Sequence, residues 1–197
     1  MGMPAVQNDW TVERALALPE DGKRYEVLDG ELFMTPAPTW GHQEAIEYLH
    51  PALREYVRAH ALGWTKLSPA DIVFSRRRLV QPDLFVVPAG PEGKPKSWTD
   101  VKSLLLVIEV LSPTTASADR GRKRLIYQEQ RVPEYWIVDL EARLVERWRP
   151  EDASAELIVE TLEWQPRPDL APLRIDLPAF FDEVLGRSRT GSRPLGS

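Results

Sequence analysis

Two carboxylates stand at unusual places in the sequence. Glu109 lies inside the apolar run 104–111, LLLVIEVL, which is typical of a strand buried on both faces. Asp83 follows Pro82 in VQPDLFVV, and proline belongs at a strand edge or a bulge because it lacks an N–H. A carboxylate is rarely buried unless a cation pairs with it. If the two runs form neighbouring strands, Asp83 and Glu109 meet at one sheet end, where they could hold a hard divalent cation.

A lysine follows these acids on a helix that we predict over about residues 118–130. Asp119 and Lys123 are four residues apart and therefore share one face of that helix. Ile126 and Tyr127 lie on the same face, and this apolar pair should turn it toward the sheet. A lysine beside two metal-binding acids can hold a phosphate oxygen and stabilise the charge that develops in phosphoryl chemistry.

Each of these residues also has an ordinary structural interpretation. Asp83 could be a turn acid after Pro82, and Glu109 could be paired with an arginine. Asp119 could be the N-cap of its helix, where a carboxylate accepts backbone N–H bonds. Lys123, taken alone, could be one of the many lysines that helices expose to solvent. The four residues in this order nevertheless favour one site over four unrelated structural roles.

The composition excludes several classes of site. The 197 residues contain no cysteine, which excludes disulfides, thiolate zinc sites and cysteine nucleophiles. The three histidines lack metal-ligand spacing, and the sequence has neither a phosphate-binding glycine loop nor a G-x-S-x-G motif. No apolar run reaches the length of a membrane span and no signal peptide is recognisable, so we expect a cytoplasmic protein with no membrane contact.

The charge and the tryptophans give little support for a nucleic-acid-binding protein. The net charge is −5, although three basic clusters could supply local positive potential: residues 76–78, the pair Lys94 and Lys96, and residues 120–124. The seven tryptophans are scattered through the chain. This scatter suggests core or interface positions more than a base-stacking platform.

The order of predicted elements favours one α/β domain of the α+β kind with a mixed sheet, over residues 1–186. Asp29-Gly30 is a typical two-residue turn and predicts an N-terminal hairpin. A long helix is expected over about residues 38–63, and Pro51 should kink it or divide it. Three short strand-like runs follow, WTKL, DIVFS and LVQPDLFVVP, before the run that contains Glu109. The tail 187–197 lacks an apolar pattern and is expected to be disordered.

The run QPDLFVV, together with VIEVLSPTTASADRGRKRLIYQEQRVPEYWIVD, resembles the bacterial restriction endonuclease family of the Uma-two type, a branch of the PD-(D/E)XK nuclease superfamily. The upstream run RYEVLDGELFMTPAPTWGHQ is similar to the same family. The resemblance implies a mixed central sheet flanked by helices and a phosphodiesterase that depends on Mg²⁺ or Mn²⁺, with Asp83 and Glu109 as metal ligands. The superfamily motif has a lysine two residues after the second acid, where this chain has Leu111. The resemblance therefore implies that the following helix supplies the basic residue, as Lys123.

The resemblance also points to two supporting residues. Glu31 follows the hairpin turn in DGEL and matches the family, so it could add an acid to the site; an ordinary glutamate on a surface hairpin is the alternative. His42 begins the long helix, from which superfamily members often present a polar side chain.

These features together predict an endonuclease that acts on nucleic acid, with DNA as the expected substrate and a homodimer as the default assembly. Asp83 and Glu109 would bind Mg²⁺, which lowers the pKa of a bound water, and Lys123 would stabilise the charge on the phosphate. Two alternatives stay open. A non-catalytic nucleic-acid-binding or assembly module on the same fold agrees slightly better with the acidic net charge. Hydrolysis of a small phosphoester would require a closed pocket in place of an open groove.

Overall fold

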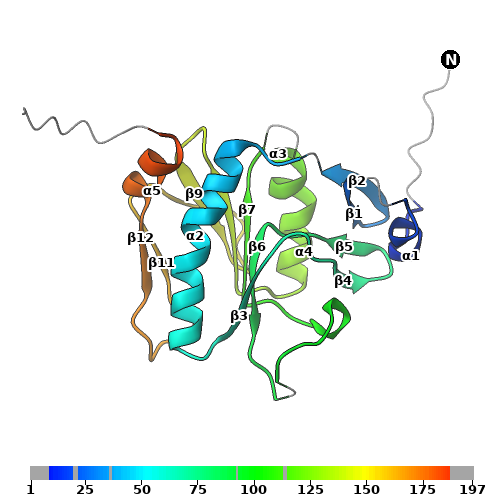
Figure 1. Cartoon of the computed structure of the whole chain (residues 1–197), viewed down its shortest axis with the longest axis horizontal. Coiled ribbons are helices and arrows are strands. Elements are labelled where there is room, and N and C mark those ends of the chain that lie inside the picture. Colours follow the sequence, from blue (N-terminus) through cyan, green and yellow to red (C-terminus); the bar gives the residue numbers. More distant parts are fainter. Residues whose placement is uncertain (1–8, 20–21, 36, 92, 113–114, 187–197) are drawn as a thin grey trace, which may run out of the picture.

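The computed structural model describes residues 9–19, 22–35, 37–91, 93–112 and 115–186 of the chain. The tail at 187–197 lies outside the described residues. A six-stranded mixed sheet forms the centre of the fold (Figure 1). In pairing order, its strands are β10 (Glu156–Ile158), β9 (Leu144–Trp148), β8 (Glu134–Asp139), β7 (Leu106–Val110), β6 (Leu84–Pro88) and β3 (Gly63–Leu67).

A four-stranded sheet contains the N-terminal hairpin. In pairing order, its strands are β2 (Glu31–Thr35), β1 (Arg24–Leu28), β5 (Arg78–Val80) and β4 (Ile72–Ser75). The turn between β1 and β2 places Asp29 at φ 53° and Gly30 at φ 89°, and a tight two-residue hairpin turn of this kind requires both positive values. The predicted hairpin is therefore confirmed. Helix α1 (Val12–Leu16), capped by the hydroxyl of Thr11, packs against β1.

Helices cover both faces of the six-stranded sheet (Figure 1). The helical elements are α2 (Trp40–Ala59), the 3-10 turn η1 (Trp98–Asp100), α3 (Ala116–Ala118), the π turn η2 (Asp119–Lys123), α4 (Arg124–Glu129) and α5 (Leu177–Val184). A small hairpin of β11 (Thr161–Trp164) and β12 (Leu173–Asp176) lies beside α2. Within the described residues, no helix is both long and apolar enough to cross a bilayer.

Helix α2 differs from the sequence prediction at Pro51, because it continues as one helix and is not divided there. Proline removes the hydrogen bond to the carbonyl of the residue four positions earlier, which is Glu47. Both Pro51 and Glu47 are exposed, so water can satisfy that carbonyl. The opposite side of α2 is apolar and packs on the sheet, which stabilises the helix across the interruption.

The strand β7 is buried on both faces, as its continuous apolar run predicts. All five of its residues are buried. Leu106, Ile108 and Val110 pack in the core beneath α2, whereas Val107 packs in the opposite core with Tyr127 of α4. Glu109 shares the face of Val107, because side chains alternate along a strand. Its carboxylate therefore lies under the helix that carries Lys123.

Strand pairing brings Asp83 next to Glu109. Strands β6 and β7 are antiparallel neighbours, and Leu84 pairs with Ile108. Asp83, which precedes Leu84, therefore lies at the same sheet end as Glu109, which follows Ile108. The run LVQPDLFVVP differs from the prediction of one strand, because it forms two: β5 ends at Val80 and β6 begins at Leu84. Pro82 cannot donate to a ladder, and the chain changes sheets at this point.

Candidate active site

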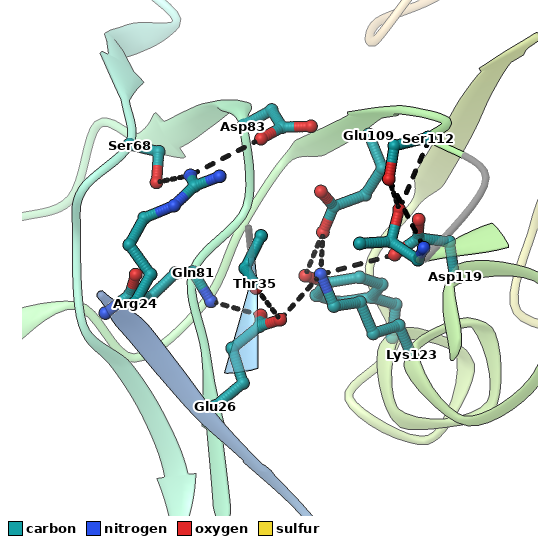
Figure 2. A network of polar contacts seen from close by, with 12 residues as sticks. Arg24, Glu26, Thr35, Ser68, Gln81, Asp83, Glu109, Ser112, Asp119 and Lys123 are labelled. Carbon is teal, nitrogen blue, oxygen red and sulfur yellow. Dashed lines mark hydrogen bonds and ion pairs between the residues drawn. The ribbon is translucent and has the colours of Figure 1, made fainter. Parts of the chain in front are cut away.

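Asp83 occupies the break between β5 and β6, and three other elements hold its side chain. Its Oδ2 accepts a hydrogen bond from Val110 N of β7 at 3.0 Å and lies 2.9 Å from His42 Nε2 of α2. Arg24 of β1 places its Nη1 3.7 Å from Oδ1 and donates to the hydroxyl of Ser68 (Figure 2). Asp83 is therefore a fixed, buried acid and has more partners than a simple turn residue needs.

Lys123 lies at the centre of a buried group of carboxylates. Its ammonium nitrogen is 3.0 Å from Glu109 Oε1, 3.0 Å from Glu26 Oε2 and 3.3 Å from Asp119 Oδ1. All four side chains are at most 4% exposed. Figure 2 shows the lysine extending from its helix turn toward acids from β1 and β7. The structure thus brings Lys123 and Glu109 together, and Asp83 lies just before β6, the strand next to that of Glu109.

Glu26 was missed by the sequence analysis, which selected Glu31 from the same hairpin. Glu26 is 2% exposed. Besides the ion pair with Lys123, it accepts hydrogen bonds from Gln81 N at 2.7 Å and Thr35 Oγ1 at 3.3 Å. A signal was available, because Glu26 interrupts the apolar run of β1 in the way that Glu109 interrupts β7. We refer below to Glu26, Asp83, Glu109, Asp119 and Lys123 as the acidic cluster.

Glu31 does not join the acidic cluster. It lies at the start of β2 and pairs with Arg122, whose Nη2 donates to Glu31 Oε1 at 2.8 Å. Arg122 also covers the ring of Phe33, with its guanidinium carbon 5.5 Å from the ring centroid. The structural alternative, a glutamate on a surface hairpin, therefore describes Glu31 better than a role in the site.

Asp119 is not the N-cap of its helix, which was the structural alternative to a role in the site. The N-cap of α3 is Thr115, and Asp119 begins the π turn that follows. In a π turn the backbone bonds run to the fifth residue, so the helix is locally wider; single π turns are common at functional sites. Asp119 and Lys123 stand at its two ends, and both point into the acidic cluster.

The residues between them point away from the acidic cluster. Arg120 donates to Asp139 at 2.7 Å and to Glu146 at 2.6 Å, on the side of β8 and β9. Arg122 reaches the hairpin at Glu31. The basic run that looked like one cluster in the sequence is therefore split into separate pairs, and only its lysine reaches the buried acids.

Burial and charge act in opposite directions on the two central carboxyls. Burial would raise the pKa of Asp83, but the hydrogen bond and charge of His42, Lys123 and the Val110 N–H outweigh it, so the pKa is lowered. Burial raises the pKa of Glu109 well above its usual range, and the neighbouring acids add to this effect. One ammonium shared among three carboxylates does not compensate for each of them.

The ammonium of Lys123 itself is held firmly in its charged form. Burial would lower the pKa of Lys123, but Glu109, Glu26 and Asp119 together raise it well above the usual value. Tyr127 adds a hydrogen bond from its hydroxyl to Glu109 Oε1 at 3.2 Å. Counting Arg24 as well, four carboxylates face two permanently charged cations, so acids outnumber these cations in the site.

The donor chemistry fits a hard divalent cation. The four acids of the cluster offer carboxylate oxygens, the donors that hard cations prefer. Among the described residues, Asp119 Oδ1 accepts no hydrogen bond and has only its ion pair with Lys123. In the described part of the chain, no three acids or histidines are already arranged around an empty metal position. Lys123 instead occupies the point toward which three of the carboxylates converge. A metal ion would therefore share these acids with the lysine, or take some of them from it.

The acidic cluster opens into a narrow pocket. The pocket is lined by Asp83, Glu109 and Lys123 together with His42 and Arg24. Further lining residues include Thr35, Ala37, Pro38, Ser112 and Thr115. His42 thus joins the predicted site residues, while its Nδ1 is buried without a hydrogen-bond partner among the described residues.

Residues 12–180 match the Uma2 family, whose description reads "Putative restriction endonuclease". The chain belongs to the Uma2 family. The match spans most of the chain, including both strands of the hairpin, α2 and all five members of the acidic cluster. It confirms the resemblance inferred from the sequence runs around Asp83 and Glu109.

A solved structure from Anabaena variabilis has a similar fold. Its title describes "a putative nuclease belonging to DUF820". The two share 18% sequence identity and a TM-score of 0.73, over 89% of this chain and 99% of that chain. At this identity the likeness shows the fold, and it confirms the predicted mixed α+β architecture. No curated protein matches the chain.

Proposed function

We propose that this protein is a metal-dependent nuclease that hydrolyses phosphodiester bonds of nucleic acid. The observation that supports it best is the buried acidic cluster, in a chain of a family described as "Putative restriction endonuclease". Gathering three carboxylates around one ammonium is unfavourable for folding, because each buried charge loses hydration that the pair recovers only in part. Such arrangements are found more often at functional sites than in ordinary cores.

Mg²⁺ or Mn²⁺ is the cofactor that suits the donors. Asp83 and Glu109 are the proposed ligands, and Glu26 is a further oxygen donor on the other side of Lys123. Hard oxygen ligands without cysteine favour these ions over Zn²⁺. When bound, the metal would lower the pKa of a water molecule and so provide the nucleophile.

The chain's own residues would divide the remaining work. His42 and the Val110 N–H orient Asp83, and Tyr127 orients Glu109. Lys123 would hold a phosphate oxygen and stabilise the charge that develops there, which requires it to leave part of its contact with the carboxylates. In the absence of another cation it offsets part of the negative charge of those carboxylates.

A cleavage assay on labelled DNA and RNA, with Mg²⁺, Mn²⁺ or EDTA, tests the proposal. We expect cleavage with either metal, none with EDTA, and a preference for DNA. Glu26→Gln should lower the rate by about 10- to 100-fold, the usual effect of disturbing a residue that supports a metal site. Glu31→Gln is the matched control on the same hairpin and should keep the wild-type rate. Cleavage that persists in EDTA, or equal effects of the two variants, would contradict the proposal.

A second candidate is a non-catalytic module on the same fold. The observation that favours it is the set of ion pairs around Lys123, which gives three of the carboxylates a cationic partner without a metal. Under this candidate, nucleic acid binds but no metal stimulates cleavage. The homodimer expected from the sequence stays a prediction for either function. The molecular mass of the protein in solution would test it directly.

A further inference from the structure

We infer that a second site, a basic groove along the edge strand β3, binds single-stranded nucleic acid by stacking bases on Trp64 and Trp98. This inference rests on the proposed function, because the groove would hold a part of the substrate strand that lies away from the acidic cluster. The groove is lined by Trp64, Lys66, Val87, Lys94, Pro95, Lys96, Ser97, Trp98 and Val101. Sites for single-stranded nucleic acid share two features: cations along the path of the phosphate backbone, and aromatic rings on which the bases stack. This groove has both.

The two tryptophans are 34 positions apart in the sequence but line the same groove. Trp64 lies on β3 opposite Val87 of β6, and Trp98 lies on η1 with its ring centroid 6.2 Å from that of Phe85. Trp98 is 37% exposed and Trp64 is half-buried, so each ring packs on the protein and still offers surface to a ligand. The scatter of tryptophans along the sequence concealed this pair.

Cations surround the tryptophans on a protein that is acidic overall. Lys66, Lys94 and Lys96 line the groove, and Arg54 and Arg58 of α2 flank β3 on its other side, where Lys66 and Lys94 line the adjoining hollow. In the part of the chain that the structure describes, the three lysines form no ion pair. Their charges are therefore available to phosphates.

The loop that carries Lys96 and Trp98 is ordered by its own hydrogen bonds. Asp100 Oδ2 accepts from Lys96 N and Ser97 N, each at 2.9 Å, and these bonds close the turn η1. Val101 is buried against the sheet and anchors the end of the turn. A loop held in this way presents its aromatic ring with little loss of conformational entropy on binding.

The strand β3 leads from the groove toward the acidic cluster. Trp64 and Lys66 are two residues apart in β3 and therefore point to the same side of the sheet, and Ser68 follows the end of the strand. Ser68 accepts the hydrogen bond of Arg24, which lies 3.7 Å from Asp83. At about 3.3 Å per residue, Trp64 lies roughly 13 Å along the strand from Ser68. A strand bound in the groove could therefore reach the proposed catalytic pocket.

A second copy of this chain is the main competing occupant, because β3 is an edge strand of the six-stranded sheet. Charge disfavours it, since pairing two such edges would bring Lys66, Lys94, Arg54 and Arg58 of both copies together. A nucleic-acid strand carries the opposite charge and supplies the flat rings that tryptophan stacks on.

The test is fluorescence anisotropy of a labelled single-stranded oligonucleotide and of its duplex, with the full chain in EDTA so that no cleavage interferes. We expect tighter binding of the single strand. Trp98→Leu should weaken it by about 5- to 150-fold, the usual effect of losing one stacked base, and Trp98→Phe should restore most of the affinity. Equal affinity for the duplex, or no difference between Trp98→Leu and Trp98→Phe, would overturn base stacking.

Charge variants complete the test. The double variant Lys94→Ala/Lys96→Ala should reduce the dependence of log affinity on log salt by about 1.4, because each phosphate contact on a single strand contributes about 0.7. The matched control is Arg131→Ala/Arg174→Ala, which removes two exposed cations outside the groove and should leave the slope unchanged. An equal fall in both double variants would mean only general charge attraction and would overturn the inference. Oligonucleotide binding that is lost as the chain dimerises would assign the edge to self-association and would also overturn it.

Different experimental results would reject the groove and the proposed nuclease function. Binding in EDTA that responds to Trp98, without cleavage under any metal, would retain the groove and reject the nuclease. Cleavage with an unchanged KM for Trp98→Leu and Lys94→Ala/Lys96→Ala would retain the nuclease and reject the groove.

Discussion

At the scale of single residues, each member of the acidic cluster has a different electrostatic environment. Lys123 is shared by three carboxylates, Asp83 is stabilised by His42 and a backbone N–H, and Glu109 lacks full compensation. Loss of each side chain should therefore change stability and activity in its own way. Variants of Lys123, and of Asp83 and Glu109, should distinguish a catalytic site from an ordinary buried ion pair.

Lys123→Ala should abolish most of the activity, by about 10²- to 10³-fold, because it removes the cation that faces the phosphate. The same change should destabilise the metal-free protein by about 3–5 kcal/mol, since it leaves buried carboxylates without their partner. Added Mn²⁺ should restore more stability to this variant than to the wild type, as measured by thermal unfolding.

Arg122→Ala is the control for Lys123→Ala. It removes a cation from the same π turn, but its side chain is 41% exposed and pairs with Glu31 only at the surface. Its loss should cost at most about 1 kcal/mol and little activity. Equal losses of activity from the two variants would indicate a general basic surface and would remove Lys123 from the proposed mechanism.

Asp83→Asn and Glu109→Gln should change stability in opposite directions at neutral pH in EDTA. The folded-state pKa of Asp83 is lowered below 3.8, so its stabilising effect is present above that pH and is lost as pH falls through the lowered value. The folded-state pKa of Glu109 is raised above 4.5, so its ionisation destabilises the fold as pH rises through the raised value.

We therefore expect Asp83→Asn to cost about 1–3 kcal/mol and Glu109→Gln to gain about 0.5–2 kcal/mol, while both abolish metal-dependent cleavage. Urea unfolding at pH 5 and pH 8 measures both effects. The gain from Glu109→Gln should be larger at pH 8. A loss of stability for Glu109→Gln at pH 8 would show that its ion pair with Lys123 outweighs its burial.

At the scale of elements, the sequence predicted the parts that depend on local pattern. The apolar runs around Glu109 and at 135–138 form the central strands β7 and β8, and they are parallel neighbours joined by the helix between them. Glu26 interrupts a short apolar run, but that pattern does not show which acids it meets, because this depends on the pairing of β1 with β5, more than 50 residues apart in sequence. The π turn was missed because it has no hydrophobic period of its own.

The π turn allows a prediction about geometry. Deleting Gly121 should convert it to ordinary α-helix and rotate Asp119 by about 100° relative to Lys123, because one residue of an α-helix turns through that angle. Helix content by circular dichroism should stay the same while cleavage is lost. Gly121→Ala is the control: a Cβ there meets no atom within 4 Å, so the variant should keep activity and gain up to about 1 kcal/mol of stability. Full activity in the deletion variant would show that the π turn does not position the site.

At the scale of the whole molecule, the two sheets and the helix turn after β7 converge on one acidic pocket, while the basic groove is lined by residues of β3 and of the segment 94–101. The net charge of −5 averages over these opposite surfaces and therefore gives little indication of what the protein binds. The excess negative charge of the pocket is the property that connects the fold to the proposed chemistry.

Calorimetric titration with Mn²⁺ tests the central claim, that the acidic cluster is a cation site, most directly. Because the pKa of Glu109 is raised, binding should release protons and become tighter as pH increases from 6 to 8, and titrations in buffers of different ionisation enthalpy count those protons. We predict one site per chain in the wild type and none in Asp83→Ala/Glu109→Ala. Mn²⁺ binding of unchanged affinity in that double variant would show that the metal site lies elsewhere and would contradict the account.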